Sequence, residues 1–316
     1  MRPAFRTPAR SSRRRDSVAK SPGPIAFIRW RGQALPTVSE PGTLAEAAEL
    51  LRSGARISIE RDGGDVVLST RGLNRVLEHE PGDLTAIVEA GMRLSELRER
   101  LAVHGQMLAI DPPGDPTVGA CLAGDLSGPR RHRYGAMRDL VIGVTVVLAD
   151  GTIASSGGKV VKNVAGYDLA KLFSGSAGRL GLIARVALRL HPLPAASRTV
   201  VADIDSAAEF WAGLVATPLE PSAVDILAPG RAALLFEGSE RAVAEQVGAA
   251  PGSEADPAIW AACLDAQSTG MPIPFTFDAP LVRPGPGLAF GVGTARPWSP
   301  LAERVRAALD PEGVLA

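Results

Sequence analysis

Two glycine-rich segments, residues 112–128 and 172–183, constrain the fold of this chain more than any other feature. Glycines at such spacing allow backbone N–H groups to approach a phosphate or a ring edge without obstruction by a Cβ atom. Neither segment is a GxGxxG dinucleotide turn or a P-loop, because the strand–turn–helix context and the GK[ST] ending are missing. Spacing alone therefore leaves two interpretations open: backbone contacts to a cofactor, or tight turns and close packing.

The first hundred residues alternate helices with short strands. Thr43 and Glu46 form a capping box, which predicts a helix that ends before Gly54. Three further strands and a helix stopped by Gly105 follow from the apolar periodicity. The strands are expected at 56–59, 66–68 and 84–90, and the helix from residue 94. This alternation is typical of a small α/β unit.

A second unit begins near residue 108. Strands are expected at 140–149 and 152–155, joined by a hairpin turn at Asp150 and Gly151, and at 181–190, where apolar residues alternate. The prolines of residues 191–194 end the last strand and mark a domain boundary.

The remaining residues predict half or more of a ferredoxin-like sheet. Strands are expected at 198–203, 222–227 and 231–236, and helices at 206–216 and 240–247. Residues 251–287 are rich in Pro and Gly, and no element can be assigned there. Ser299 and Pro300 begin a last helix at about 301–309.

Charge and cysteine content narrow the possible functions. The formal net charge is zero, but residues 1–31 carry nine Lys/Arg and one acid, so the rest holds 25 basic and 33 acidic residues. An acidic body is poorly suited to a nucleic-acid backbone. Cys121 and Cys263 lie in no metal-binding pattern, which fits a reducing cytoplasm and excludes an iron–sulfur site ligated by this chain. No apolar run spans a bilayer. The basic leader, residues 1–34, is expected to be disordered, with a partner-binding arm or translated sequence upstream of the true start as the alternatives.

The residues in and between the glycine-rich segments resemble the FAD-binding domain of the vanillyl-alcohol-oxidase, or p-cresol-methylhydroxylase, superfamily. The sequences SGPRR at 127–131 and KNVAGYDL at 162–169 are similar to the FAD-binding subunit of bacterial glycolate oxidase in particular. The resemblance is dense over residues 66–194 and returns at 304–315. It implies an α+β fold. Its parts are a two-part FAD-binding domain at 35–194 (subdomains 35–107 and 108–194), a shortened ferredoxin-like α/β cap at 195–297, and a C-terminal helix at 298–316 that returns to the FAD domain.

The resemblance also implies that the flavin lies extended between the two subdomains, held largely by backbone groups. One wall would be formed by the first glycine-rich segment and the opposite loop by the second. A carboxylate at Asp125 departs from the family pattern and needs an arginine to neutralise it beside a phosphate. The expected cofactor-binding residues are Pro113, Thr117, Gly119, Asp125, Ser127, Gly128, Gly175, Ser176, Gly178, Gly181 and Ile183.

The implied activity is oxidation of glycolate or a similar 2-hydroxy acid by hydride transfer to non-covalent FAD. Electrons would then pass to a larger flavoprotein subunit and an iron–sulfur subunit, in the cytoplasm or at the membrane surface through these partners. The reaction needs a cation for the substrate carboxylate and a base for the hydroxyl proton. Arg138, Lys162 and Tyr167 are the candidates, and the sequence does not assign their roles. The basic run at 130–135 is either an anion-binding loop or a solvated one.

Two departures from the family leave other functions open. The family's longer glycine-rich loop after the first strand is reduced here to residues 60–65, which contain no histidine, so a covalent histidyl flavin from that loop is excluded. The cap is also short, so substrate identity is the least transferable property. The alternatives are a degenerate structural subunit without flavin, and a stand-alone flavin oxidase of another alcohol.

Overall fold

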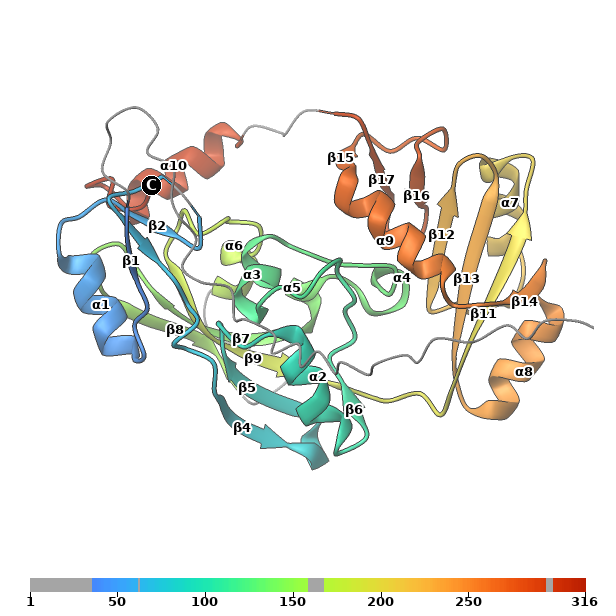
Figure 1. Ribbon diagram of the computed structural model, residues 1–316, viewed down its shortest axis with the longest axis horizontal. Coiled ribbons are helices and arrows are strands. Elements are labelled where there is room, and N and C mark those ends of the chain that lie inside the picture. The colour runs from blue at the N-terminus through green and yellow to red at the C-terminus, as the bar shows by residue number, and fades with distance from the viewer. Residues whose placement is uncertain (1–35, 62, 159–167, 294–297) are drawn as a thin grey trace, which may run out of the picture. The chain divides into compact units, whose positions relative to one another are not determined.

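The computed structural model describes residues 36–61, 63–158, 168–293 and 298–316. The expected leader and two catalytic candidates, Lys162 and Tyr167, lie outside these ranges. Within the described ranges, no helix is both long and apolar enough to cross a bilayer. Residues from Pro36 onwards belong to one compact unit of mixed helices and sheets (Figure 1).

The first part combines one helix with a three-stranded parallel sheet in the order β1-β3-β2. Its elements are β1 (Thr37–Ser39), α1 (Leu44–Arg52), β2 (Ile57–Ile59) and β3 (Val66–Leu68). Thr43 caps α1 by accepting a hydrogen bond from the backbone N–H of Glu46 at 3.2 Å, as the sequence predicts. The Glu46 carboxylate accepts from the N–H of Gly42 instead of that of Thr43, so the expected capping box is only half formed.

The second part is a five-stranded antiparallel sheet in the order β4-β5-β9-β7-β8, with helices packed on one face (Figure 1). Its strands are β4 (Val76–Glu80), β5 (Thr85–Glu89), β7 (Val141–Val147), β8 (Ile153–Gly157) and β9 (Leu182–Arg189). Its helices are η1 (Pro81–Asp83), α2 (Leu94–Ala102), α3 (Val118–Ala123), α4 (Arg131–Tyr134), α5 (Met137–Leu140) and α6 (Leu169–Phe173). A short ladder joins β6 (Gln106–Met107) to β10 (His191–Pro192).

The alternation predicted for residues 181–190 is confirmed only in the second half of β9, the central strand of this sheet. In the first half, Leu182 and Ala184 pack in the cluster of the first part of the chain, and Ile183 joins the other cluster. Val186 and Leu188 are buried in one hydrophobic cluster with residues of α2, α3 and α6, whereas Arg185 and Arg189 are half-buried on the other face. This arrangement places the loop before β9, which carries the second glycine-rich segment, next to α3.

The third part is a seven-stranded antiparallel sheet in the order β14-β11-β13-β12-β16-β17-β15. Its strands are β11 (Ala196–Asp203), β12 (Ala223–Leu227), β13 (Arg231–Gly238), β14 (Ser253–Ala255), β15 (Met271–Ile273), β16 (Leu281–Arg283) and β17 (Leu288–Gly291). Its helices are α7 (Ala207–Val215), α8 (Glu240–Ala249) and α9 (Ile259–Thr269). The expected βαββα run is confirmed. Residues 251–287, which the sequence left unassigned, contain three of the strands and α9.

The last helix, α10 (Pro300–Leu309), begins after Ser299, whose side chain accepts a hydrogen bond from Ala302 N–H at 3.1 Å. Val305 and Leu309 pack against the hydrophobic cluster under the five-stranded sheet, so the helix contacts the second part of the chain. Farther on, Leu315 forms a parallel bridge with Ile57 of β2.

Candidate cofactor site

The two glycine-rich segments border one cavity of about 240 Å³. Five of the expected cofactor-binding residues line it: Thr117, Gly119, Gly178, Gly181 and Ile183. The sequence did not single out the other lining residues, which are Ile59, Glu60, Arg61, Thr70, Ala120, Ala123, Gly124, Ala177 and Leu182. Pockets for whole cofactors span roughly 300–1,000 Å³. The cavity therefore matches one part of a dinucleotide, such as the diphosphate and the groups beside it.

The start of α3 forms one wall, and its backbone donors are already used. The Thr117 hydroxyl accepts from Ala120 N–H at 3.1 Å, and Gly119 N–H donates to Ala90 O at 2.7 Å. A Cβ atom on Gly119 would lie 2.8 Å from the Cβ of Ala90, so close packing against the end of β5 accounts for this glycine. The N–H of Gly119, which was expected to approach a phosphate, is therefore not available in this arrangement.

The loop before β9 forms the opposite wall and is held by the end of α3. Gly175 N–H donates to Leu122 O at 3.0 Å, and Ala177 N–H donates to Ala123 O at 2.8 Å. Gly178 has φ +75°, a conformation that favours glycine, and its backbone lies against Ile59. These bonds fix the spacing between the two glycine-rich segments.

The remaining expected residues do not line the cavity. Pro113 lies in the loop ahead of α3. Gly175 and Ser176 border a different hollow of about 390 Å³ beside α10, and the buried Ser176 hydroxyl has no hydrogen-bond partner in the described part of the chain. A Cβ on Gly128 would overlap the backbone carbonyl of Asp111, so this glycine is required by a close approach of two chain segments.

The expected difficulty with Asp125 is resolved by the loop that follows it. The Arg131 guanidinium lies 3.5 Å from the Asp125 carboxylate and donates to the Ser127 hydroxyl at 3.1 Å. An arginine thus neutralises the acid, as the sequence argument required. The two expected residues Asp125 and Ser127 are joined by this arginine at the edge of the first segment.

The basic run at 130–135 is neither the free anion-binding loop nor the solvated loop that the sequence suggested. Its arginines bind groups of this chain instead. Arg130 donates to the buried carboxylate of Glu237 on β13 and, through its backbone N–H, to Asp111 at 3.0 Å. Arg133 reaches the Glu237 carbonyl at 3.4 Å. Burial raises the pKa of the Asp111 carboxyl to about 6, although the charge of Arg130 opposes this.

The same helix, α4, fits His132 against the third part of the chain. A Cβ on Gly285 would overlap the His132 ring, which lies 6.0 Å from the Trp211 ring in an edge-on orientation. Close by, Gln267 of α9 donates to the Ser127 carbonyl at 2.6 Å and accepts from the fully buried Arg283 at 3.3 Å. Sequence reasoning missed the contacts of His132 with Gly285 and of Gln267 with Ser127, because each joins residues more than a hundred positions apart.

Of the three expected catalytic residues, only Arg138 lies in the described part of the chain. The side chain of Arg138 is 52% exposed, lies 3.8 Å from its neighbour Asp139, and does not line the cavity. Lys162 and Tyr167 fall outside the description. Among the described residues, no group of three or more His, Cys, Asp or Glu side chains could hold a metal ion.

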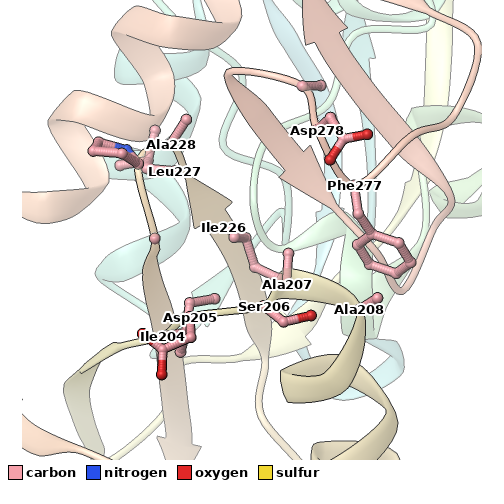
Figure 2. Close-up of a pocket in the computed structure, with 13 residues that line it drawn as sticks. Ile204, Asp205, Ser206, Ala207, Ala208, Ile226, Leu227, Ala228, Phe277 and Asp278 are labelled. Carbon is pink, nitrogen blue, oxygen red and sulfur yellow. The ribbon is translucent and has the colours of Figure 1, made fainter.

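A separate pocket of about 310 Å³ lies in the third part of the chain, near the start of α7 (Figure 2). It is lined by residues 204–208, 226–230 and 277–279. Ser206 already caps α7 through the N–H of Glu209 at 3.3 Å. This pocket contains none of the expected site residues and shares no residue with the cavity between the glycine-rich segments.

Comparisons with known proteins agree with the geometry. A family model described as an FAD binding domain matches residues 49–157. Glycolate oxidase subunit GlcE of Escherichia coli is 31% identical over 230 residues, which cover 68% of this chain and 65% of that protein. Glycolate oxidase subunit GlcD of Bacillus subtilis is 36% identical over 169 residues, 52% of this chain and 36% of that protein. The mitochondrial D-lactate dehydrogenase (cytochrome) 1 of Saccharomyces cerevisiae is 34% identical over 158 residues, 49% of this chain and 27% of that protein.

Among solved structures, alkyldihydroxyacetonephosphate synthase has a TM-score of 0.58 at 20% identity, over 71% of this chain and 53% of that one. This likeness shows a shared fold. The chain spans from about a quarter to just under two thirds of the length of the curated relatives named above.

Proposed function

This chain belongs to the p-cresol-methylhydroxylase-type FAD-binding superfamily, and from that membership we propose that it is the FAD-binding subunit of a glycolate oxidase-like complex. The proposed reaction is oxidation of glycolate or a similar 2-hydroxy acid, with electrons passed on to a larger flavoprotein and an iron–sulfur subunit. We assign FAD binding to residues 35–194 and cap contacts to residues 195–297. A cytoplasmic location, with membrane contact only through partners, completes the proposal.

One observation carries the proposal: the two glycine-rich segments, far apart in sequence, border the same cavity. When bound, FAD would supply the hydride acceptor for the alcohol carbon. Thr117, Gly178 and the Ile183 backbone are the groups of this chain that would contact it. All four histidines lie in described residues and none lines the cavity, nor does either cysteine, which supports non-covalent binding.

The substrate-facing groups stay predictions. Lys162 and Tyr167 remain our candidates for carboxylate binding and for the base that takes the hydroxyl proton. Arg138 is a weaker candidate, because its guanidinium is largely exposed and lies beside Asp139. Both cysteines are buried and free, so an electron route through iron–sulfur ligands would have to use another subunit.

The test begins with a titration of the purified chain with FAD. One sample of the complex is then precipitated with acid, and a second sample receives glycolate or D-lactate under anaerobic conditions. We expect flavin absorbance that follows the protein through gel filtration and is released into the supernatant by acid. Bleaching by one of the two acids, in the presence of the partner subunits, would support the substrate class. Colour that stays in the precipitate would contradict non-covalent binding.

A second candidate, a structural subunit without flavin, is favoured by one feature. Glu60, in the shortened first loop, has φ +55° and turns its carboxylate to the backbone N–H and hydroxyl of Thr70. A carboxylate in this position repels a diphosphate. A chain that stays colourless after incubation with FAD, yet stabilises its partner subunits, would establish this candidate in place of the first.

A further inference from the structure

One arginine lines the cavity, and a second belongs to the loop that forms one of its walls. Arg61 lines it directly after Glu60, and Arg179 follows Gly178 of the second glycine-rich segment. Arg61 donates to an oxygen of Ala316, and, among the described residues, neither guanidinium pairs with an Asp or Glu side chain. We propose that Arg61 and Arg179 together bind the diphosphate of the cofactor, in place of the longer glycine-rich loop that is reduced here to residues 60–65. This inference rests on the proposed function, since it concerns how that same site holds FAD.

A packing contact joins the two chain segments that carry the arginines. A Cβ on Gly178 would lie 3.2 Å from the Cβ of Ile59, so the strand end before Arg61 touches the loop before Arg179. Burial lowers the pKa of Arg61, and the positive charge of Arg179 lowers it further. Two cations that repel each other are stabilised by an anion placed between them.

The hydrogen bonds of Arg61 also favour a bound anion. One of its terminal nitrogens donates to the backbone oxygen of Ala316, but its buried Nε has no partner in the described ranges. Leaving a buried donor unpaired is unfavourable, and a phosphate oxygen would satisfy it. Arg179 lies over the Trp298 ring at 5.0 Å, and a stacked guanidinium keeps its in-plane N–H groups free to donate.

The backbone N–H groups at the start of α3 are already engaged. The N–H groups of Val118, Gly119 and Ala120 donate to Met92, Ala90 and Thr117 within the chain. Glu60, which lines the cavity, adds one negative charge beside the positive charge of Arg61. A diphosphate presents two phosphoryl groups, one for each guanidinium fork. The arginines thus supply with side chains what a glycine-rich loop supplies with backbone N–H groups.

The experiment compares flavins that differ in their phosphates. Wild type, Arg61→Met, Arg179→Met and the double variant are titrated with FAD and with riboflavin, and binding is followed by flavin fluorescence. Arg71→Met is the control, because Arg71 is exposed and does not line the cavity. Methionine keeps the apolar stem, and Arg61→Lys adds a variant that retains charge. Thermal unfolding checks that each variant is folded.

Each single variant is expected to raise the Kd for FAD roughly tenfold to 150-fold, the effect of losing a charge-assisted hydrogen bond. The affinity of each single variant for riboflavin should be unchanged. The Kd of Arg71→Met for FAD should match that of wild type, and the Kd of Arg61→Lys for FAD should lie between those of wild type and Arg61→Met. The affinity of wild type for FAD should also weaken with salt more steeply than that of the double variant.

Two results would overturn the inference while leaving FAD binding intact: folded variants with the FAD affinity of wild type, or variants that lose riboflavin as much as FAD. The second would mean that the arginines shape the cavity as a whole. If wild type binds neither flavin, the proposed function fails, and the diphosphate role fails with it.

Discussion

The ion pair between Arg283 and Asp225 is the most sharply testable stabilising contact in the third part of the chain. Both side chains are fully buried, and the two carboxylate oxygens accept from Nε and Nη2 at 2.6 and 2.7 Å. Replacing Arg283 with Met leaves an uncompensated buried carboxylate. Replacing Asp225 with Asn leaves an uncompensated buried guanidinium. Breaking such a pair from one side costs about 3–5 kcal/mol.

For a unit of this size, 1 kcal/mol corresponds to about 2–4 °C in melting temperature, so each single variant should melt about 6–20 °C lower. The double variant Arg283→Met, Asp225→Asn carries no buried charge. It should therefore be less destabilised than the sum of the singles, with a coupling energy of at least about 1 kcal/mol. The assay is urea unfolding followed by circular dichroism, with melting curves as a second measure.

The exposed pair of Arg241 and Glu245, with nitrogen and oxygen 2.8 Å apart, provides the control. Arg241→Met should cost less than about 1 kcal/mol, because water already solvates both groups. The reasoning that burial of the partner charge sets the cost would be refuted by either of two results. One is that the single variants of the buried pair lose no more free energy of unfolding than this control. The other is that the double variant loses the full sum of the two single losses.

Three further results are expected. Between about pH 4 and 7, the free energy of unfolding should fall as pH rises because of Asp111. Its pKa of about 6 in the folded state exceeds the unfolded value of 3.8, so the folded state binds the proton more tightly. The difference in pKa corresponds to a loss of about 3 kcal/mol across this range. Urea unfolding of Asp111→Asn should lack this component, and identical pH profiles would contradict it. Gly178→Val should lower stability by about 1–3 kcal/mol, because the residue has φ +75° and lies against Ile59; an unchanged melting temperature would show that the loop adapts. Cys121 and Cys263 should not react with a thiol reagent at pH 8 until the chain unfolds, since burial raises both thiol pKa values, that of Cys121 to about 12; fast labelling of the folded protein would disprove this.

Periodic segments were predictable from the sequence because their neighbours along the chain decide their structure. The capping of α1 by Thr43, the alternation in the second half of β9 and the βαββα run after residue 195 all follow from local patterns. Helix α9 was missed because its sequence, Ile259–Thr269, is rich in alanine and lies between prolines and glycines that mask its periodicity. Helix α3 was missed because Gly119 and the glycines and prolines that flank the helix suggested a loop.

The candidate site was predictable only in part, for a physical reason. A glycine that lets a ligand approach and a glycine that lets another backbone approach have the same sequence signature. Gly119 and Gly128 are accounted for by Ala90 and Asp111, and neither partner can be identified without the fold. The importance of Arg61 was likewise hidden, since the charge that lowers its pKa belongs to Arg179, more than a hundred residues later.

The packing of α4 against the third part of the chain has a consequence for chimeras built from two related proteins. Arg130 needs the carboxylate of Glu237, and His132 needs a position without a side chain at Gly285. A transplanted segment 195–297 that supplied any other residues there would meet an unpaired cation and a steric overlap. Chimeras with a junction near residue 194 should therefore yield folded protein only when Glu237 and Gly285 come from the same parent as α4. The residues before and after the junction thus have to be exchanged together, although they form separate sheets.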